Sequence, residues 1–424
     1  MAGLLAAACL VGCTTVPGGA TGHPGRAAPP GDAATSAGSG VGTPPPSPAP
    51  SPAPGPPSTG PTSGGSPAPT HSPATPPPAS PPADPLAGWT VEQQVAQVLM
   101  VGVRTSAPQQ LSHDLVADGT VANVFLQGRT EAGRVRVGNL VRWFTDDLPA
   151  GPGHGRPLLV ATDQEGGQVQ VLRGQGFSDI PTAVQQGRTE PAALRSSATG
   201  WGRELAAVGV TVDLAPVVDL PTPAGAAANA PVGHDDRQYG FTVDDVVTHA
   251  SAFAAGMADA GVHTVIKHFP GLGRVTGNTD AVDGVTDTTT DAGSDQVAVV
   301  RRMVDDGVWG VMVSTADYAL LDPGVPAAFS PVVVGDLLRG DLGFDGLVVT
   351  DDLSGAAQVA GWTPGERAVL AVAAGCDLVL ASEVPQVAPE MAQALSARAR
   401  TDPEFAARLA DAVRHVLAAK AATA

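Results

Sequence analysis

Eight short apolar runs, separated by alanine-rich segments, dominate the sequence from about Pro85 to its end. A run that is apolar at nearly every position is typical of a strand that is buried on both faces. The runs are Val95–Val103, Val121–Gln127, Leu158–Asp163, Val212–Asp219, Val262–His268, Gly310–Thr315, Gly346–Asp352 and Cys376–Ala381. Eight β/α repeats over about 340 residues predict an α/β fold of the (β/α)8 TIM-barrel type rather than a doubly wound sheet.

Segments with a helical pattern lie between most of these runs. They are Pro191–Val208, Asp244–Ala260, Asp295–Asp306 and Glu366–Ala374, with Pro403–Ala422 as a closing amphipathic helix. Because strands and helices use up the whole of residues 85–424, we assign this range to a single barrel domain and expect no second globular domain.

The first residues have the form of a bacterial lipoprotein signal peptide. Residues 1–13 read MAGLLAAACLVGC, an apolar run that ends in a lipobox-like sequence at Cys13, the expected site of lipidation. The run is shorter than the roughly 20 apolar residues that span a bilayer. No Lys or Arg precedes it, which leaves a start further upstream open. A chance cysteine after an apolar N-terminus is the alternative.

Residues 14–84 consist almost entirely of Pro, Ser, Gly, Ala and Thr. Such a stretch cannot bury enough apolar surface to offset its ordering entropy, so we predict a disordered tether. An acyl anchor followed by a long tether predicts an extracytoplasmic enzyme or receptor that contacts the cell membrane only through its N-terminal lipid.

Charge and cysteine content narrow the possible partners. The formal net charge of −18 argues against a nucleic-acid partner, because a phosphate-binding surface should be basic. Cys376 is the only cysteine in residues 85–424, so we expect no disulfide within the domain. The histidines are scattered, and we predict no metal and no cofactor. The sequence does not predict the oligomeric state.

Only two lysines occur in the chain, and one of them, Lys267, ends a β-like run within Val265–Gly273. The other basic residues are all arginines. Lysine brings a compact ammonium where arginine brings a broad planar fork, so a lone lysine at a strand end indicates a site that needs a point charge. A chance lysine at a strand end is the alternative from this fragment alone.

Polar residues also end several other predicted strands, where the active site of a barrel lies. These ends carry Asp163, Asp219, the pair Lys267-His268, and the pair Asp351-Asp352. One carboxylate at such a place could be a helix N-cap, and Asp352 suits that role. Several carboxylates at one barrel mouth favour carbohydrate chemistry, since glycosidases need two proton-transferring or nucleophilic groups around one bond.

Three motifs in this order carry a family resemblance. They are DQEGG at Asp163–Gly167, KHFPG at Lys267–Gly271 and GLVVTDDLSGA at Gly346–Ala356. Together they resemble glycoside hydrolase family 3, and most of all its single-domain β-N-acetylhexosaminidases, over about Thr90–Ala418. The resemblance implies a barrel enzyme that hydrolyses β-glycosides with retention of configuration, through a glycosyl-aspartate intermediate.

The resemblance also implies roles for individual residues. Asp351 matches the nucleophile, and its neighbour Asp352 matches a second acidic position that we expect to be structural. Asp163, Lys267 and His268 match residues that hold sugar hydroxyls in the −1 subsite. Arg237 resembles the sugar-binding arginine of the family.

Two departures from the family pattern stand out. The hexosaminidases continue the KHFPG motif with a His and an Asp that form a mobile acid/base dyad, whereas this chain has Asp280 in place of the His and Asn278 in place of the Asp. A carboxylic acid can do the same work if burial raises its pKa, and the glycines nearby suggest a mobile loop. A solvated loop carboxylate with ordinary titration is the alternative for Asp280.

The second departure concerns an arginine that follows DQEGG in many members and binds the sugar. Val171 stands at that place here, and Arg173, two residues further on, is the candidate substitute. One sugar contact therefore depends on where Arg173 points.

The leading hypothesis is a membrane-tethered exo-acting β-N-acetylglucosaminidase that acts on cell-wall fragments or related small carbohydrate substrates. A β-glucosidase or β-xylosidase of the same fold is one alternative. A non-catalytic saccharide-binding lipoprotein, which retains the −1 subsite but lacks a competent acid, is another.

Overall fold

The computed structural model describes residues 84–146, 148 and 156–423. By its internal contacts the chain divides into Met1–Pro78 and Ala79–Ala424, and all described residues belong to the second unit. The predicted lipobox with Cys13 and the predicted tether at 14–84 therefore lie outside the described residues, apart from Asp84. Within the described part, no helix combines the length and the apolar character needed to cross a membrane.

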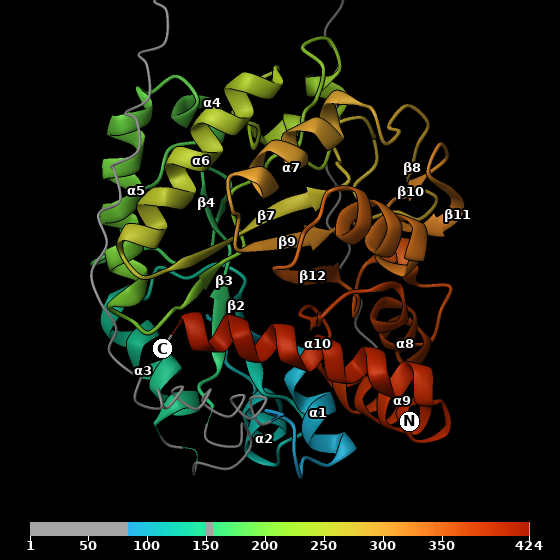
Figure 1. Ribbon diagram of the computed structural model, residues 1–424. Helices are drawn as coiled ribbons and strands as arrows, with labels where there is room; N and C mark the ends of the chain where they lie inside the picture. The colour runs from blue at the N-terminus through green and yellow to red at the C-terminus, as the bar shows by residue number, and fades with distance from the viewer. Residues whose placement is uncertain (1–83, 147, 149–155, 424) are drawn as a thin grey trace, which may run out of the picture. The chain divides into compact units, whose positions relative to one another are not determined.

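Eight parallel strands close into a barrel in the order β1-β13-β12-β9-β7-β6-β3-β2 (Figure 1). This confirms the predicted (β/α)8 fold. The barrel strands are β1 (Leu99–Arg104), β2 (Asn123–Gln127), β3 (Leu159–Thr162), β6 (Val212–Asp213), β7 (His263–Phe269), β9 (Gly310–Val313), β12 (Leu347–Asp352) and β13 (Leu378–Ala381). Two small sheets lie outside the barrel, formed by β4 (Gln164–Gly166) with β5 (Val169–Gln170), and by β8 (Thr286–Asp287), β10 (Asp317–Tyr318) and β11 (Asp322–Pro326).

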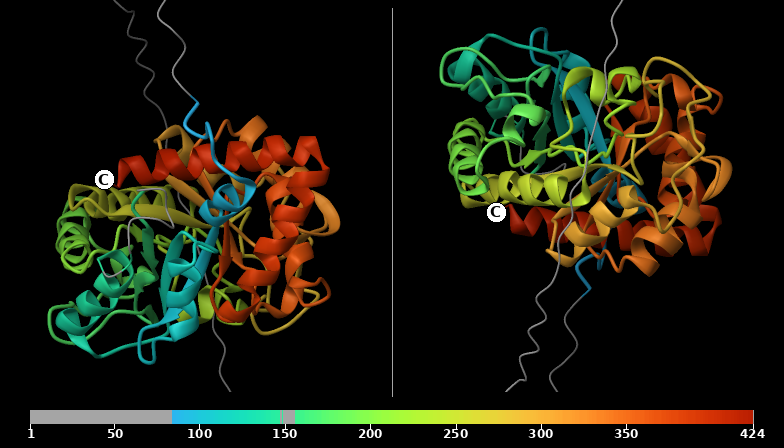
Figure 2. Two further views of the ribbon diagram at one scale, coloured as in Figure 1. Left: turned by 90° about the horizontal axis from the view of Figure 1, so that it is seen from below. Right: turned by 90° about the horizontal axis from the view of Figure 1, so that it is seen from above.

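Helices surround the barrel, and α5 and α6 lie side by side along one flank (Figure 2). The α-helices are α1 (Val91–Gln97), α2 (Gln110–Ala117), α3 (Gly133–Thr145), α4 (Ala183–Gln186), α5 (Pro191–Ala206), α6 (Val243–Asp259), α7 (Asp295–Asp305), α8 (Pro364–Ala374), α9 (Ala388–Thr401) and α10 (Pro403–Ala422). Short 3₁₀ segments are η1 (Ala226–Ala228), η2 (Gly233–Asp235), η3 (Ala327–Phe329), η5 (Ala357–Val359) and η6 (Pro385–Val387), and η4 (Val332–Asp341) is π-helical.

Helix α10 closes the N-terminal end of the barrel. Its Val416 and Ala419 belong to the apolar cluster that fills the barrel interior, and its Lys420 bonds to Gln97 and Ala122 just before β1 and β2. Side chains of the described residues therefore fill the barrel at the end where its strands begin. The open end is the one at which the strands finish, where active sites of this fold lie.

Most predicted strands are shorter in the structure than in the sequence pattern, and two of them show a physical reason. Val95 lies in α1, because Thr90 caps that helix through a reciprocal capping box with Gln93, and β1 begins only at Leu99. The predicted strand Val212–Asp219 has regular pairing only at Val212–Asp213, and Val217 adds an isolated bridge to Lys267. Pro216 interrupts this ladder because proline has no N–H to donate.

Strand alternation brings the polar strand ends inside the barrel. In β7, Val265 packs in the barrel interior and Ile266 packs against the surrounding helices, so Lys267 faces inward again. In β12, Leu347 and Val349 face inward and Val348 outward, which gives Asp351 the inward direction. The two-residue period thus sends both side chains into one space.

Candidate active site

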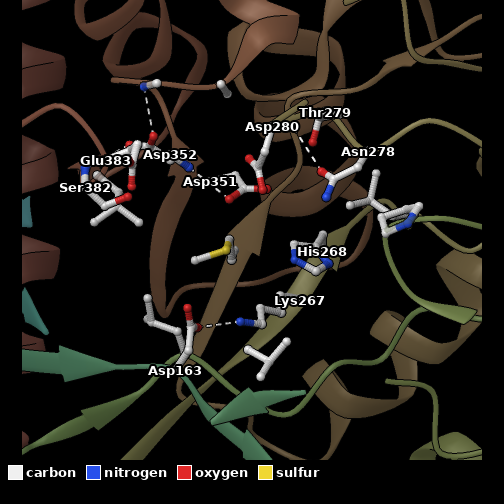
Figure 3. A pocket seen from close by; sticks show the side chains of 18 of the residues that line it. Asp163, Lys267, His268, Asn278, Thr279, Asp280, Asp351, Asp352, Ser382 and Glu383 are labelled. Atoms are coloured by element: carbon white, nitrogen blue, oxygen red, sulfur yellow. Dashed lines mark hydrogen bonds and ion pairs between the residues drawn. The ribbon is translucent and has the colours of Figure 1, made fainter. Parts of the chain in front are cut away.

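A cavity of about 430 Å³ opens at the C-terminal end of the barrel. Six of the residues predicted for the site line it together, from five different strand ends or loops: Asp163, Arg237, Lys267, His268, Asp280 and Asp351. Figure 3 shows Asp163 and Lys267 on one side of this cavity and Asp280 and Asp351 on the other. Phe125, Leu214, Met312 and Leu380, which belong to the barrel or its interior core, supply apolar surface.

Lys267 is the cationic centre of the cavity. Its Nζ lies 2.6 Å from Asp163 Oδ1 and 2.7 Å from Glu165 Oε1, and its side chain is almost fully buried. Burial by itself would lower the pKa of the ammonium, but the two carboxylates outweigh burial and raise it. Lys267 is therefore charged at every physiological pH and holds the Asp163 carboxylate in a fixed direction.

Arg237 reaches the same cluster from the loop that follows β6. Its Nε and Nη2 donate to the two carboxylate oxygens of Glu165 at 2.9 and 2.7 Å, and Nη1 donates to the carbonyl of Pro231. Burial would raise the pKa of Glu165, but Arg237 and Lys267 together lower it to about 2. Glu165 is thus an ionised anchor for two cations, and Arg237 lines the cavity in a fixed orientation.

His268 is oriented by Asp219, which is completely buried. The Nδ1 atom of His268 lies 2.7 Å from Asp219 Oδ2, while Asp219 Oδ1 accepts from the backbone N–H groups of His268 and Leu272. Because a carboxylate accepts, Nδ1 carries the proton, and Nε2 is left to meet a ligand in the cavity. Asp219 therefore fixes both the tautomer and the ring direction of His268.

Asp351 and Asp280 form the second pole of the cavity. Asp351 ends β12, and Asp280 lies on the segment that follows β7, with its carboxyl directed toward that of Asp351 (Figure 3). Burial, then the charges of Asp351 and Asp352, raise the pKa of Asp280 from 3.8 to about 7, against a smaller opposing effect of His268 and Arg237. An acid and nucleophile pair requires one carboxyl group that keeps its proton near neutral pH, and Asp280 meets this requirement.

Asp352 organises the loop behind Asp351. Its two oxygens accept from the backbone N–H groups of Ser354, Gly355 and Ser382 and from the Ser354 hydroxyl. The following helix α8 is capped by Thr363, so Asp352 is not the helix cap that its position suggests. It ties the end of β12 to the end of β13 instead.

Arg173 does not reach the cavity. Its guanidinium donates to the backbone carbonyls of Gly167 and Gln170 and pairs with the exposed Asp179. It therefore stabilises the β4–β5 hairpin and does not replace the family arginine, whose position Val171 occupies in this chain. Val171 itself is buried.

The sequence pattern assigned no role to Glu165, and it placed Asp219 at a strand end without naming a partner for it. Glu165 stands two positions after Asp163, the spacing that returns a side chain to the same face, and this signal was available. Asp219 ends the fourth run, but its partner His268 is distant in sequence, so only the fold pairs them. Within the described residues, no group of three or more His, Cys, Asp and Glu side chains could hold a metal ion.

A closed (β/α)8 barrel with paired carboxyl groups at its C-terminal mouth has the arrangement that glycoside hydrolysis requires. Residues 90–419 match the model of the glycosyl hydrolase family 3 N terminal domain. The chain belongs to glycoside hydrolase family 3.

Relatives with known sequences and structures agree with this assignment. The crystal structure of a β-N-acetylhexosaminidase from Beutenbergia cavernae is 52% identical, with a TM-score of 0.77, and the match covers 78% of this chain and 98% of that one. The β-hexosaminidase LpqI of Mycobacterium tuberculosis is 34% identical over 72% of this chain and 77% of the relative. A β-hexosaminidase of Alkalilimnicola ehrlichii is 38% identical over 55% of this chain and 67% of the relative.

Proposed function

We propose that this glycoside hydrolase is an exo-acting, retaining β-N-acetylglucosaminidase in which Asp351 is the nucleophile and Asp280 the acid/base. The observation that carries the mechanism is the pair of carboxyl groups at the cavity, one of which has its pKa raised to about 7. The names of the relatives, β-N-acetylhexosaminidase and β-hexosaminidase, support the sugar. They do not favour the glucosidase, xylosidase or binding-protein alternatives.

In the first step Asp351 attacks the anomeric carbon while Asp280 gives its proton to the glycosidic oxygen, so the leaving group departs as a neutral alcohol. In the second step Asp280, now a carboxylate, takes a proton from water, and the resulting hydroxide displaces Asp351 from the sugar. Lys267, Asp163, His268 and Arg237 would hold the sugar hydroxyls and acetamido group during both steps.

The mechanism can be tested by trapping the intermediate. A fluorinated β-N-acetylglucosaminide with a good leaving group should leave a sugar covalently bound to the peptide that contains Asp351, and NMR at early time should show product of unchanged β configuration. An inverted product, or a label on another residue, would refute the assignment. Parallel assays with aryl glucosides and xylosides measure the preference for the N-acetyl sugar.

The cellular location belongs to the same proposal. The apolar run that ends at Cys13 and the Pro- and Ser-rich residues 14–84 support lipid anchoring outside the cytoplasm, where cell-wall fragments are the nearest β-N-acetylglucosaminides. Cys13→Ala should release the protein from the membrane fraction and abolish labelling by palmitate. A variant that remains in the membrane fraction would contradict the anchor.

A further inference from the structure

Asp280 lies on a segment that is bound to the rest of the protein at both ends. This segment, residues 271–285, follows β7 and is called the acid loop below. Its Leu272, Val275 and Thr279 are buried, although the loop has hardly any regular secondary structure. Within the loop, Asp280 N donates to Asn278 Oδ1 at 3.0 Å, and contacts from outside hold the loop as a whole in place.

Asn229 holds the beginning of the acid loop. This side chain is 2% exposed, and its Nδ2 donates to the carbonyls of Leu272 and Val275, both at 2.7 Å. Its Oδ1 accepts from the N–H groups of Val232 and Gly233 at 3.2 and 2.7 Å. All four hydrogen-bonding positions of the amide are therefore used, and they join the loop that carries Arg237 to the loop that carries Asp280.

Gln358 holds the end of the acid loop. It lies in η5, on the chain that leaves Asp351, and its side chain accepts from Val285 N at 2.8 Å and donates to Val285 O at 3.3 Å. The backbone N–H groups of Gln358 and Ala357 donate to the carbonyls of Thr279 and Asp280, at 3.0 and 3.3 Å. The acid residue is thus bonded directly to the segment that follows the nucleophile.

The glycines of the acid loop fit this close packing. A Cβ on Gly271 would lie 2.0 Å from the side chain of Gln296, and one on Gly273 would lie 2.4 Å from the backbone of Leu220. A Cβ on Gly277 would lie 2.9 Å from Val285. These glycines allow neighbouring atoms to approach, and their presence does not require that the loop move.

We propose that Asn229 and Gln358 are positioning residues that hold the acid loop in place, so that Asp280 stands beside Asp351 before substrate binds. This inference depends on the proposed role of Asp280 as the acid. A proton donor that is displaced by about 1 Å can lose on the order of 10²-fold in rate, so two buried amides at the loop ends control catalysis without touching substrate. Their effect must appear in the step that needs the proton.

The test compares two substrates of different leaving-group quality. A dinitrophenyl β-N-acetylglucosaminide needs little acid assistance, whereas a methyl β-N-acetylglucosaminide needs a proton on its leaving oxygen. For Gln358→Ala we expect kcat/KM to fall by about 10²-fold on the methyl glycoside and by less than about 3-fold on the dinitrophenyl glycoside. Asn229→Ala also loosens the loop that carries Arg237, so it should add a loss common to both substrates and keep the same excess loss on the methyl glycoside. Activity on the second substrate shows in the same experiment that the variant is folded.

Asn123 provides a matched control at the other end of the barrel. It is also fully buried, and its Nδ2 donates to the carbonyls of Gln97 and Leu99 at 2.8 and 3.0 Å while its Oδ1 accepts from Leu159 N at 3.3 Å. Asn123→Ala removes the same kinds of bond far from Asp280. It should lower the free energy of unfolding by a similar amount and change kcat/KM on the two substrates by the same factor.

Hydrogen exchange gives a readout that is independent of activity. Peptides within residues 271–285 should exchange their amide hydrogens faster in Asn229→Ala and Gln358→Ala. In Asn123→Ala their exchange rates should be unchanged. Equal losses on both substrates, or unchanged exchange in the acid loop, would overturn the inference. Asp280→Ala separates the two proposals. If it lowers kcat/KM more on the methyl than on the dinitrophenyl glycoside while the amide variants do not, only the positioning role fails. If Asp280→Ala lowers kcat/KM equally on both substrates, the acid assignment fails as well.

Discussion

The pH dependence of the reaction tests the assigned proton donor most directly. At its ordinary pKa of 3.8, fewer than about one Asp280 carboxyl in a thousand would be protonated at pH 7, whereas at a pKa of about 7 half of them are. Because acid catalysis needs the protonated form, kcat/KM on the methyl β-N-acetylglucosaminide should be level up to about pH 6 and fall about tenfold by pH 8.

The fall of activity at high pH, called the basic limb below, should differ between the free enzyme and the enzyme–substrate complex because of solvent in the cavity. The Asp280 side chain is exposed to solvent on its cavity side, although protein surrounds it on most other sides. A bound sugar displaces that water, so the charge of Asp351 is screened less and the ionised form of Asp280 loses solvation. Both effects favour the protonated form. The basic limb of kcat, which reports the enzyme–substrate complex, should therefore lie at higher pH than the basic limb of kcat/KM.

The assay is a pair of complete pH profiles, one with the methyl glycoside and one with the dinitrophenyl glycoside. The basic limb should be pronounced for the first substrate and weak for the second, and Asp280→Asn should remove it from the first together with most of the rate. A limb below about pH 5, or the same limb for both substrates, would refute the reasoning, because either result means that Asp280 titrates as an ordinary carboxylate or does not donate the proton.

Three further changes test the rest of the site and the fold. Asp351→Asn removes the nucleophile and should lower kcat/KM on the order of 10⁴-fold on both glycosides, so a loss confined to the methyl glycoside would contradict its role. Lys267→Met leaves the Asp163 and Glu165 carboxylates without their ammonium and should cost about 3–5 kcal/mol in urea unfolding, whereas an unchanged midpoint would show that the cluster adds nothing to stability. Burial lowers the pKa of Lys420 from 10.5 to about 7, so between these two pH values only the unfolded chain binds the proton at this residue. The free energy of unfolding should therefore rise with pH in this range by up to about 1.4 kcal/mol per pH unit, and Lys420→Met should remove this slope.

The barrel and most of its site could be predicted from sequence because both follow from local periodicity. Apolar runs mark buried strands, and a polar residue at the end of such a run lies at the barrel mouth once the fold is known. This is why Asp163, Lys267 and Asp351 could be placed in one cavity. The motif resemblance added Arg237 and Asp280, which lie on loops where periodicity carries no signal.

The features that could not be predicted from the sequence depend on contacts between residues that are distant in the chain. Arg173 has the right residue type near the right position, but the β4–β5 hairpin turns its guanidinium toward its own backbone carbonyls. The pairing of Asp219 with His268 needs two neighbouring barrel strands. The glycines around Asp280 suggested mobility, and only the positions of Gln296, Leu220 and Val285 explain them as close approaches.

The exchange of a histidine for Asp280 and the fixed loop are physically connected. An imidazole has a pKa near neutrality in water, so a histidine can act as acid and base even if its loop moves into solvent. A carboxyl group reaches a pKa of about 7 only while it is surrounded by protein and held near Asp351 and Asp352. A mobile loop would return Asp280 to its ordinary pKa each time it opened. Under the proposed mechanism, a carboxylic acid at this position needs the support that we assign to Asn229 and Gln358. Removing either side-chain amide should then lower both the rate and the pH at which the basic limb appears.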